Sequence, residues 1–174
     1  MIKKIIVYII LLCVFISRVA LAEPSPFGIE INKTAISEVK NKFTCKDYGI
    51  NKYSNGPMCE LDSTKLGFDG SESVRVIFDK DSKVLAVLTV FNKDQYDNLL
   101  HMLSNKYQLV SNQNPFVGNK LAEFKNETTR IILDAPHMSF ALSLNYINKD
   151  LYEKFLQQES EEQENKFKKN QRQL

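Results

Sequence analysis

The chain has 174 residues, of which 43% are hydrophobic and 25% are charged, and its 23 basic residues stand against 21 acidic ones. A formal net charge of +2 gives none of the strong basic character that is typical of nucleic-acid-binding domains. The length fits one domain. Composition therefore argues against a nucleic-acid partner and predicts a single globular domain.

The N-terminus has the three parts of a secretory signal peptide. Lys3 and Lys4 precede an apolar run at 5–16, and Ala20 and Ala22 are the small residues that a signal peptidase requires. A membrane-spanning helix needs about 20 apolar residues, and this run is shorter. We expect cleavage after Ala22, a location in the periplasm or outside the cell, and no membrane anchor afterwards. An uncleaved anchor is the alternative.

The predicted leader also carries part of the positive charge of the chain. It holds Lys3, Lys4 and Arg18 and no acidic residue. The rest of the chain therefore has a net charge of −1, from twenty basic and 21 acidic residues.

Two cysteines follow the leader, Cys45 and Cys59, on either side of the hairpin-turn signal Asn55-Gly56. In an oxidising compartment such a pair predicts a disulfide, which would stabilise the fold by about 3 kcal/mol. The alternative is a metal site that adds His101 and His137. Because no ligand pair has the spacing C-x2-C or H-x3-H, we expect no metal and no cofactor.

A short phrase recurs along the chain, as I-N-K-T at 31–34, F-N-K-D at 91–94 and I-N-K-D at 147–150. In each copy the last residue, Thr34, Asp94 or Asp150, is of a type that caps helix N-termini. The residues that follow have apolar positions at helical spacing. The phrase therefore predicts three helix starts.

The segments between the copies also match. RVIFD at 75–79 resembles RIILD at 130–134, and VLAVLTVF at 84–91 resembles FALSLNYI at 140–147. We therefore predict an α+β fold of two tandem α-β-β-β-β units, at about 31–91 and 92–147. Helices would cover the antiparallel sheet, and the two units could join edge to edge.

The predicted domain spans 23–156, with a closing helix from residue 150, and a charged helical tail follows at 157–174. Glu162 and Lys166, like Glu164 and Lys168, are i,i+4 pairs that favour a solvated helix. The tail is therefore interpreted as a solvated extension, with a docking segment as the alternative.

Catalytic residues are few. His101 lies beside the apolar stripe of the second predicted helix, which favours a packing role. His137, in the turn LDAPHMSF, could form an acid–base pair with Asp134, although Asp before Ala-Pro is also ordinary turn chemistry. No nucleotide-binding loop or nucleophile elbow is present in the sequence. We therefore expect a non-catalytic protein.

Surface residues are the remaining candidates. Phe116 and Val117 lie in the predicted loop NPFVGNK at 114–120. Apolar loop residues either pack under a sheet or contact a partner, and aromatic residues dominate interface energetics. Phe116, Val117 and His137 are therefore the candidate binding residues.

The two-unit layout resembles the β-lactamase-inhibitor-protein fold and, more distantly, the small outer-membrane assembly lipoproteins of that superfamily. Those proteins often carry Gly-x-Thr-x-x-x-Val at the first helix. Here Asn32-Lys33-Thr34 matches, Val39 comes one residue late, and the lipid-bearing cysteine has no counterpart. The resemblance implies tandem α-β4 units, and since fold likeness does not transfer function, it implies no functional residue.

Three functions are compatible with the sequence. The first is an exported protein–protein interaction module, an inhibitor or an envelope accessory, whose partner is another envelope protein. The second is a small-ligand or lipid binder that uses the face of the sheet, and the third is a hydrolase that uses Asp134 and His137. An exposed aromatic patch, an apolar pocket or a converging Asp–His pair would distinguish them.

Overall fold

The computed structural model describes residues 23–173, so the predicted leader and its cleavage site lie outside the described residues. The helices are α2 (Ile36–Lys42), α3 (Tyr96–Ser104) and α4 (Lys149–Gln171), with short 3₁₀ turns η1 (Pro26–Gly28), η2 (Ser63–Lys65) and η3 (Lys93–Gln95). The strands are β1 (Cys45–Ile50), β2 (Pro57–Leu61), β3 (Ser71–Phe78), β4 (Val84–Asn92), β5 (Gln108–Gln113), β6 (Lys120–Lys125), β7 (Thr129–Ala135) and β8 (Ala141–Asn148).

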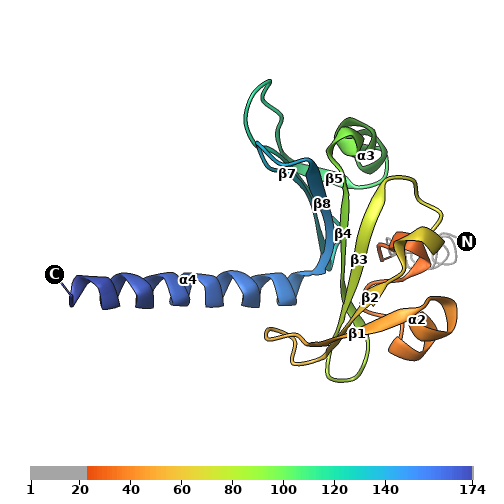
Figure 1. Ribbon diagram of the computed structural model, residues 1–174, viewed down its shortest axis with the longest axis horizontal. Helices are drawn as coiled ribbons and strands as arrows, with labels where there is room; N and C mark the ends of the chain where they lie inside the picture. Colours follow the sequence, from red (N-terminus) through yellow and green to blue (C-terminus); the bar gives the residue numbers. More distant parts are fainter. Residues whose placement is uncertain (1–22, 174) are drawn as a thin grey trace, which may run out of the picture.

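All eight strands form one antiparallel sheet in the order β1-β2-β3-β4-β8-β7-β6-β5. The two central strands, β4 and β8, pair from Ala86 with Ile147 to Asn92 with Ala141. The expected α+β class is therefore correct, with the sheet as its single organising element (Figure 1). None of the helices in residues 23–173 is long and apolar enough to cross a membrane.

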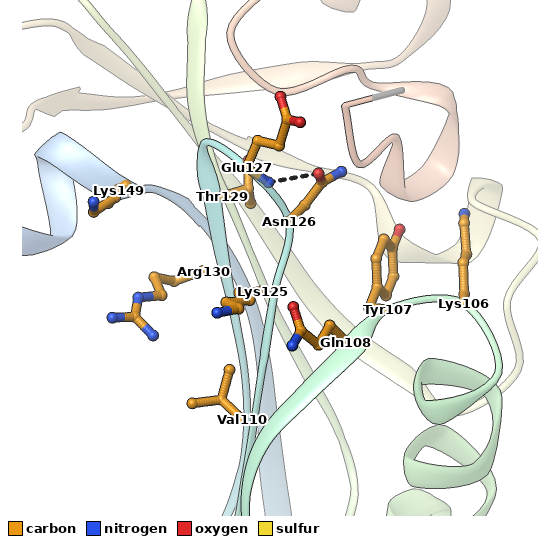
Figure 2. A pocket seen from close by; sticks show the side chains of 10 residues that line it. All are labelled: Lys106, Tyr107, Gln108, Val110, Lys125, Asn126, Glu127, Thr129, Arg130 and Lys149. Carbon is orange, nitrogen blue, oxygen red and sulfur yellow. Dashed lines mark hydrogen bonds between the residues drawn. The ribbon is translucent and has the colours of Figure 1, made fainter. Parts of the chain in front are cut away.

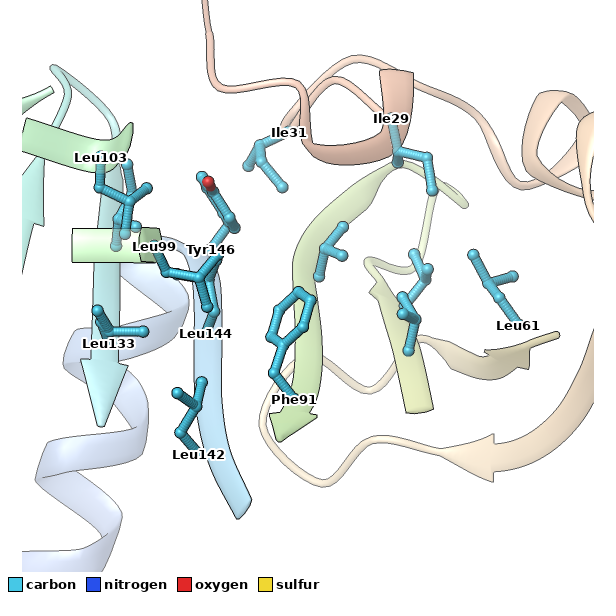
Figure 3. Packing of buried hydrophobic residues seen from close by; sticks show 14 of the residues in the cluster. Ile29, Ile31, Leu61, Phe91, Leu99, Leu103, Leu133, Leu142, Leu144 and Tyr146 are labelled. Atoms are coloured by element: carbon cyan, nitrogen blue, oxygen red, sulfur yellow. The ribbon is translucent and has the colours of Figure 1, made fainter. Parts of the chain in front are cut away.

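Alternation of side chains builds the core on one face of the sheet. In β7 every second residue from Thr129 to Ala135 is buried, as a strand with one covered face requires. Helices α2 and α3 lie on this face, opposite to the side from which α4 projects (Figure 1). Figure 3 shows the resulting cluster, which includes Ile29, Ile31, Leu61, Phe91, Leu99, Leu103, Leu133, Leu142, Leu144 and Tyr146.

The hairpin between β1 and β2 carries the expected disulfide, Cys45–Cys59, with Cα atoms 5.4 Å apart. The two cysteines are therefore covalently linked. The hairpin loop contains Gly56, where an added Cβ would lie 2.1 Å from the carbonyl oxygen of Phe78. Only glycine allows this close approach of the two backbones.

The three predicted helix caps are wrong. Thr34 accepts a hydrogen bond from the amide of Glu30 at 2.9 Å, Asp94 lies within η3, and Asp150 lies in the first turn of α4. A cap needs extended backbone angles, and Asn148 has them, with ψ 136°. Its side-chain oxygen accepts from the amide of Leu151 at 3.0 Å. In the third copy of the phrase the asparagine is therefore the cap, and the negative charge of Asp150 lies in the first turn, at the positive end of the helix.

The C-terminal segment is one continuous helix of 23 residues, α4, whose first turn packs on the sheet through Leu151, beside Ile77 and Ala86. Leu151 is buried, and farther along the helix packs against the β1–β2 loop. The Phe155 ring lies 5.3 Å from that of Tyr53 in a T-shaped pair. The hydroxyl of Tyr53 donates to Glu159 at 3.3 Å, and Lys52 pairs with Glu162 at 3.3 Å.

Candidate binding site

Four large apolar side chains are exposed on two neighbouring loops. Phe116 and Val117 in the β5–β6 loop are 103% and 69% exposed, and Met138 and Phe140 in the β7–β8 loop are 88% and 92% exposed. We name these four residues the tip cluster. Phe116 and Val117, predicted as binding residues, therefore lie on the surface rather than under the sheet.

Hydrogen bonds hold the two loops together. The amide of His137 donates to the side-chain oxygen of Asn119 at 2.6 Å. The amide of Lys93 donates to the carbonyl of Phe140 at 2.8 Å, and its ammonium group donates to the carbonyl of Pro136. The β7–β8 loop, which carries Met138 and Phe140, is therefore tied to η3, and Asn119 links it to the loop of Phe116 and Val117.

Backbone geometry also contributes to the exposure of the tip cluster. Met138 has a φ of 67°, a left-handed conformation that costs free energy for a large side chain. Such strain is concentrated at functional sites in proteins. Here it accompanies a methionine side chain that points into solvent.

Asp134 and His137 lie close in sequence and have separate surroundings. Asp134 is in β7, in register with Ser143 of β8, and burial raises the pKa of its carboxyl. His137 is exposed, and its backbone bonds to Asn119. Within residues 23–173 no hydrogen bond or ion pair is found between the two side chains.

A basic groove of about 740 Å³ lies around the ends of β5, β6 and β7. Its cations are Lys106, Lys125, Arg130 and Lys149, and its one lining carboxylate is Glu127. In Figure 2 the Glu127 carboxylate points away from Lys125 and Arg130. The groove therefore presents a surplus of positive charge.

An apolar pocket of about 210 Å³ lies on the helix-covered side of the sheet. It is lined by Pro26, Phe27, Phe68, Thr89, Phe91, Leu99, Met102, Leu103, Lys106, Tyr107, Leu144 and Tyr146. Two of these residues, Lys106 and Tyr107, also line the basic groove. The two hollows therefore share a rim at the connection between α3 and β5, while Lys125 and Arg130 of the groove project from the face of the sheet opposite to the pocket.

Comparison with protein-family models found no matching family, and comparisons with curated proteins and with solved structures found no match either. The assignment of a function therefore depends on the site itself.

Met138 and Phe140 are missing from the residues that the sequence singled out. Phe140 lies two residues before Leu142 and four before Leu144, which are buried. Strand alternation would therefore predict a core position for its side chain. However, β8 begins at Ala141, and Phe140 belongs to the loop before it. The Ala-Pro sequence at 135–136 is a turn signal, and it could have indicated that Phe140 lies in a loop rather than in a strand.

Proposed function

We propose that this protein is an exported, non-catalytic binding module that contacts another envelope protein through the tip cluster. The observation that carries the proposal is the exposure of four large apolar side chains on two loops that are tied together. Large apolar side chains exposed on neighbouring loops are candidates for an interaction site. A role as an inhibitor or as an envelope accessory fits such a surface equally well.

The energetics favour a protein surface as the occupant. Burying a side chain such as Phe or Met contributes about 1.5–3 kcal/mol. Phe116 and Phe140, both almost fully exposed, therefore have much to gain in an interface. Aromatic side chains in this position are typical anchors of interfaces, and the fixed loops reduce the entropy lost on binding.

Export is proposed from the leader pattern and from the cysteine pair. A disulfide such as Cys45–Cys59 persists in oxidising compartments outside the cytoplasm. The non-catalytic role is proposed because the sequence offers one acid–base pair, Asp134 and His137, and no hydrogen bond joins these two in residues 23–173. Since one fold can host both catalytic and non-catalytic proteins, the proposal depends on the site residues and not on the fold.

We also propose that the domain consists of two tandem α-β-β-β-β units, as in the superfamily that the sequence resembles. Support comes from the element order, in which α2 precedes β1 to β4 and α3 precedes β5 to β8. In each half the strands are neighbours in chain order. The last strands of the two halves, β4 and β8, then pair at the centre of the sheet.

Site-specific photo-crosslinking in the native envelope tests the proposed function. A photoreactive phenylalanine analogue at position 116 should capture a discrete protein, whose purified form should then bind this protein in solution. The double variant Phe116→Ser/Phe140→Ser should weaken that binding by at least tenfold.

The matched control is Phe167→Ser, which removes a phenylalanine that is 68% exposed on α4 and should leave binding unchanged. Equal loss in the control, or full affinity in the double variant, would show that the tip cluster is not the contact surface.

A further inference from the structure

The apolar pocket has walls of aromatic and aliphatic side chains from both halves of the sheet. Phe27, Phe68 and Phe91 form a row of edge-to-face contacts, with ring centroids 6.3 Å and 5.3 Å apart. Leu99 and Leu103 from α3 line the opposite part. These surroundings favour an apolar guest over a polar one.

The size of the apolar pocket suits a short hydrocarbon chain. A dry apolar cavity of roughly 150 Å³ binds benzene in water, and this pocket has about 210 Å³. Its few polar groups belong to Thr89, Lys106 and the tyrosines Tyr107 and Tyr146. The rings of Tyr107 and Tyr146 form a T-shaped pair with centroids 6.1 Å apart, and Lys106 is the charged residue among those that line the pocket.

Lys106 connects the apolar pocket to the basic groove. It lines both, and Figure 2 shows it beside Tyr107 on one side of the strands, with Arg130 and Lys149 on the other. Among residues 23–173, Lys106, Lys125 and Arg130 take part in none of the ion pairs, and Lys149 pairs with Glu153 at a long 3.8 Å. These cations are therefore available to an anion.

We propose that the apolar pocket binds an anionic amphiphile. The apolar chain occupies the pocket of Phe91, Leu99 and Leu144, and the carboxylate or phosphate head lies at Lys106, on the rim that the pocket shares with the basic groove. The charge of Lys106 selects the anionic head, and burial of the chain drives binding. This site is separate from the tip cluster and does not depend on the proposed function.

Titration of the whole exported protein with three amphiphiles of equal chain length tests the proposal. We expect decanoate to bind more tightly than decanol, and decyltrimethylammonium to bind most weakly, as measured by calorimetry. Octanoate, which is two methylenes shorter, should bind about 16-fold more weakly than decanoate, because each buried methylene contributes about fourfold. Equal affinity for all three head groups would overturn the proposal.

Two variants test separately how the pocket binds the apolar chain and how Lys106 binds the anionic head. Met102, which is 40% exposed and lines the pocket, can be enlarged at low cost to folding, and Met102→Trp should abolish decanoate binding. Lys106→Ala should weaken decanoate about tenfold and leave decanol unchanged. Lys166→Ala, on the solvated part of α4, is the charge-matched control and should bind decanoate normally. Wild-type affinity in both Met102→Trp and Lys106→Ala would overturn the site.

Competition with lipid vesicles distinguishes a membrane lipid from a free amphiphile as the ligand. If phosphatidylglycerol vesicles displace decanoate and phosphatidylcholine vesicles do not, the ligand is a membrane lipid. If neither displaces it, the ligand is a free single-chain amphiphile. Equal displacement by both vesicles would contradict selection by charge. Phe116→Ser/Phe140→Ser should leave decanoate affinity unchanged, so failure of one proposal is distinguishable from failure of the other.

Discussion

The side chain of Asn148 donates a hydrogen bond to the side-chain oxygen of Asn32 at 2.7 Å, so two copies of the repeated phrase meet although they lie at opposite ends of the domain. Asn32 in turn donates to the hydroxyl of Thr128 at 2.9 Å, and Thr128 donates to the carboxylate of Glu23. Asn32 has a φ of 66°, which asparagine tolerates better than most residues. This network joins the N-terminal segment to the start of α4.

Asn148→Ala should lower the free energy of unfolding by about 1–2 kcal/mol, because it removes both the cap of α4 and the bond to Asn32. Urea denaturation provides the measurement. Asn92→Ala is the matched control, since Asn92 occupies the equivalent position before η3 and makes no capping bond through its side chain. It should change stability by less than about 0.5 kcal/mol. Similar losses in both variants would show that the cap and the Asn32 bond contribute little.

Tyr96→Phe should raise the stability by about 1 kcal/mol. Within residues 23–173 the buried hydroxyl of Tyr96 has no hydrogen-bond partner, and a buried unsatisfied group costs about 1–3 kcal/mol. Thermal unfolding of the variant measures the gain. Tyr53→Phe, which removes a hydroxyl that donates to Glu159 at 3.3 Å, should have the opposite sign. A loss of stability in Tyr96→Phe would indicate that its hydroxyl has a partner in solution.

The sequence predicted the strands well, because a strand with one covered face shows local alternation of side chains. RVIF at 75–78 lies in β3 and RIILD in β7, and the disulfide lies where the cysteine pair indicated. The cap of α4 is Asn148, two residues before the predicted Asp150, because Asn and Asp are both good capping residues and only backbone angles decide between them. The apolar pocket brings together side chains from η1, α3 and β8, and such long-range packing has no signature in any single segment.

Asp134 should make stability depend on pH. Burial raises the pKa of its carboxyl in the folded state, so the charged form is disfavoured there and reduces stability at neutral pH. This penalty fades as the pH falls through the raised folded value and is absent below the unfolded value of about 3.9. Asp134→Asn should therefore be more stable than wild type at pH 7, with the difference shrinking in acid.

Asp62→Asn should show the opposite effect on stability when the two variants are compared over the same range of pH. The Asp62 carboxylate accepts from the hydroxyl of Thr64 at 2.6 Å, and this bond lowers its pKa. Its contribution is present above the unfolded pKa and is lost as the pH falls through the folded one, so the variant should be less stable at pH 7. Denaturation midpoints that shift in the same direction for both variants would contradict these assignments.

Tyr53 should hold the exposed part of α4 in place. Its ring packs on Phe155 and its hydroxyl donates to Glu159. From residue 157 onward, the other described side chains of the helix are exposed. Because a polar helix without packing is marginal in water, Tyr53→Ala should let this segment fray.

Limited proteolysis measures the fraying. Cleavage in 157–171 should become several-fold faster in Tyr53→Ala, because local opening, rather than global unfolding, exposes the helix. Tyr48→Ala is the control, since Tyr48 stacks on Arg75 at 3.6 Å and, within residues 23–173, forms no hydrogen bond or ring contact with α4. If both variants are cleaved at the wild-type rate, Leu151 and the Asn148 cap hold the helix without help from the β1–β2 loop.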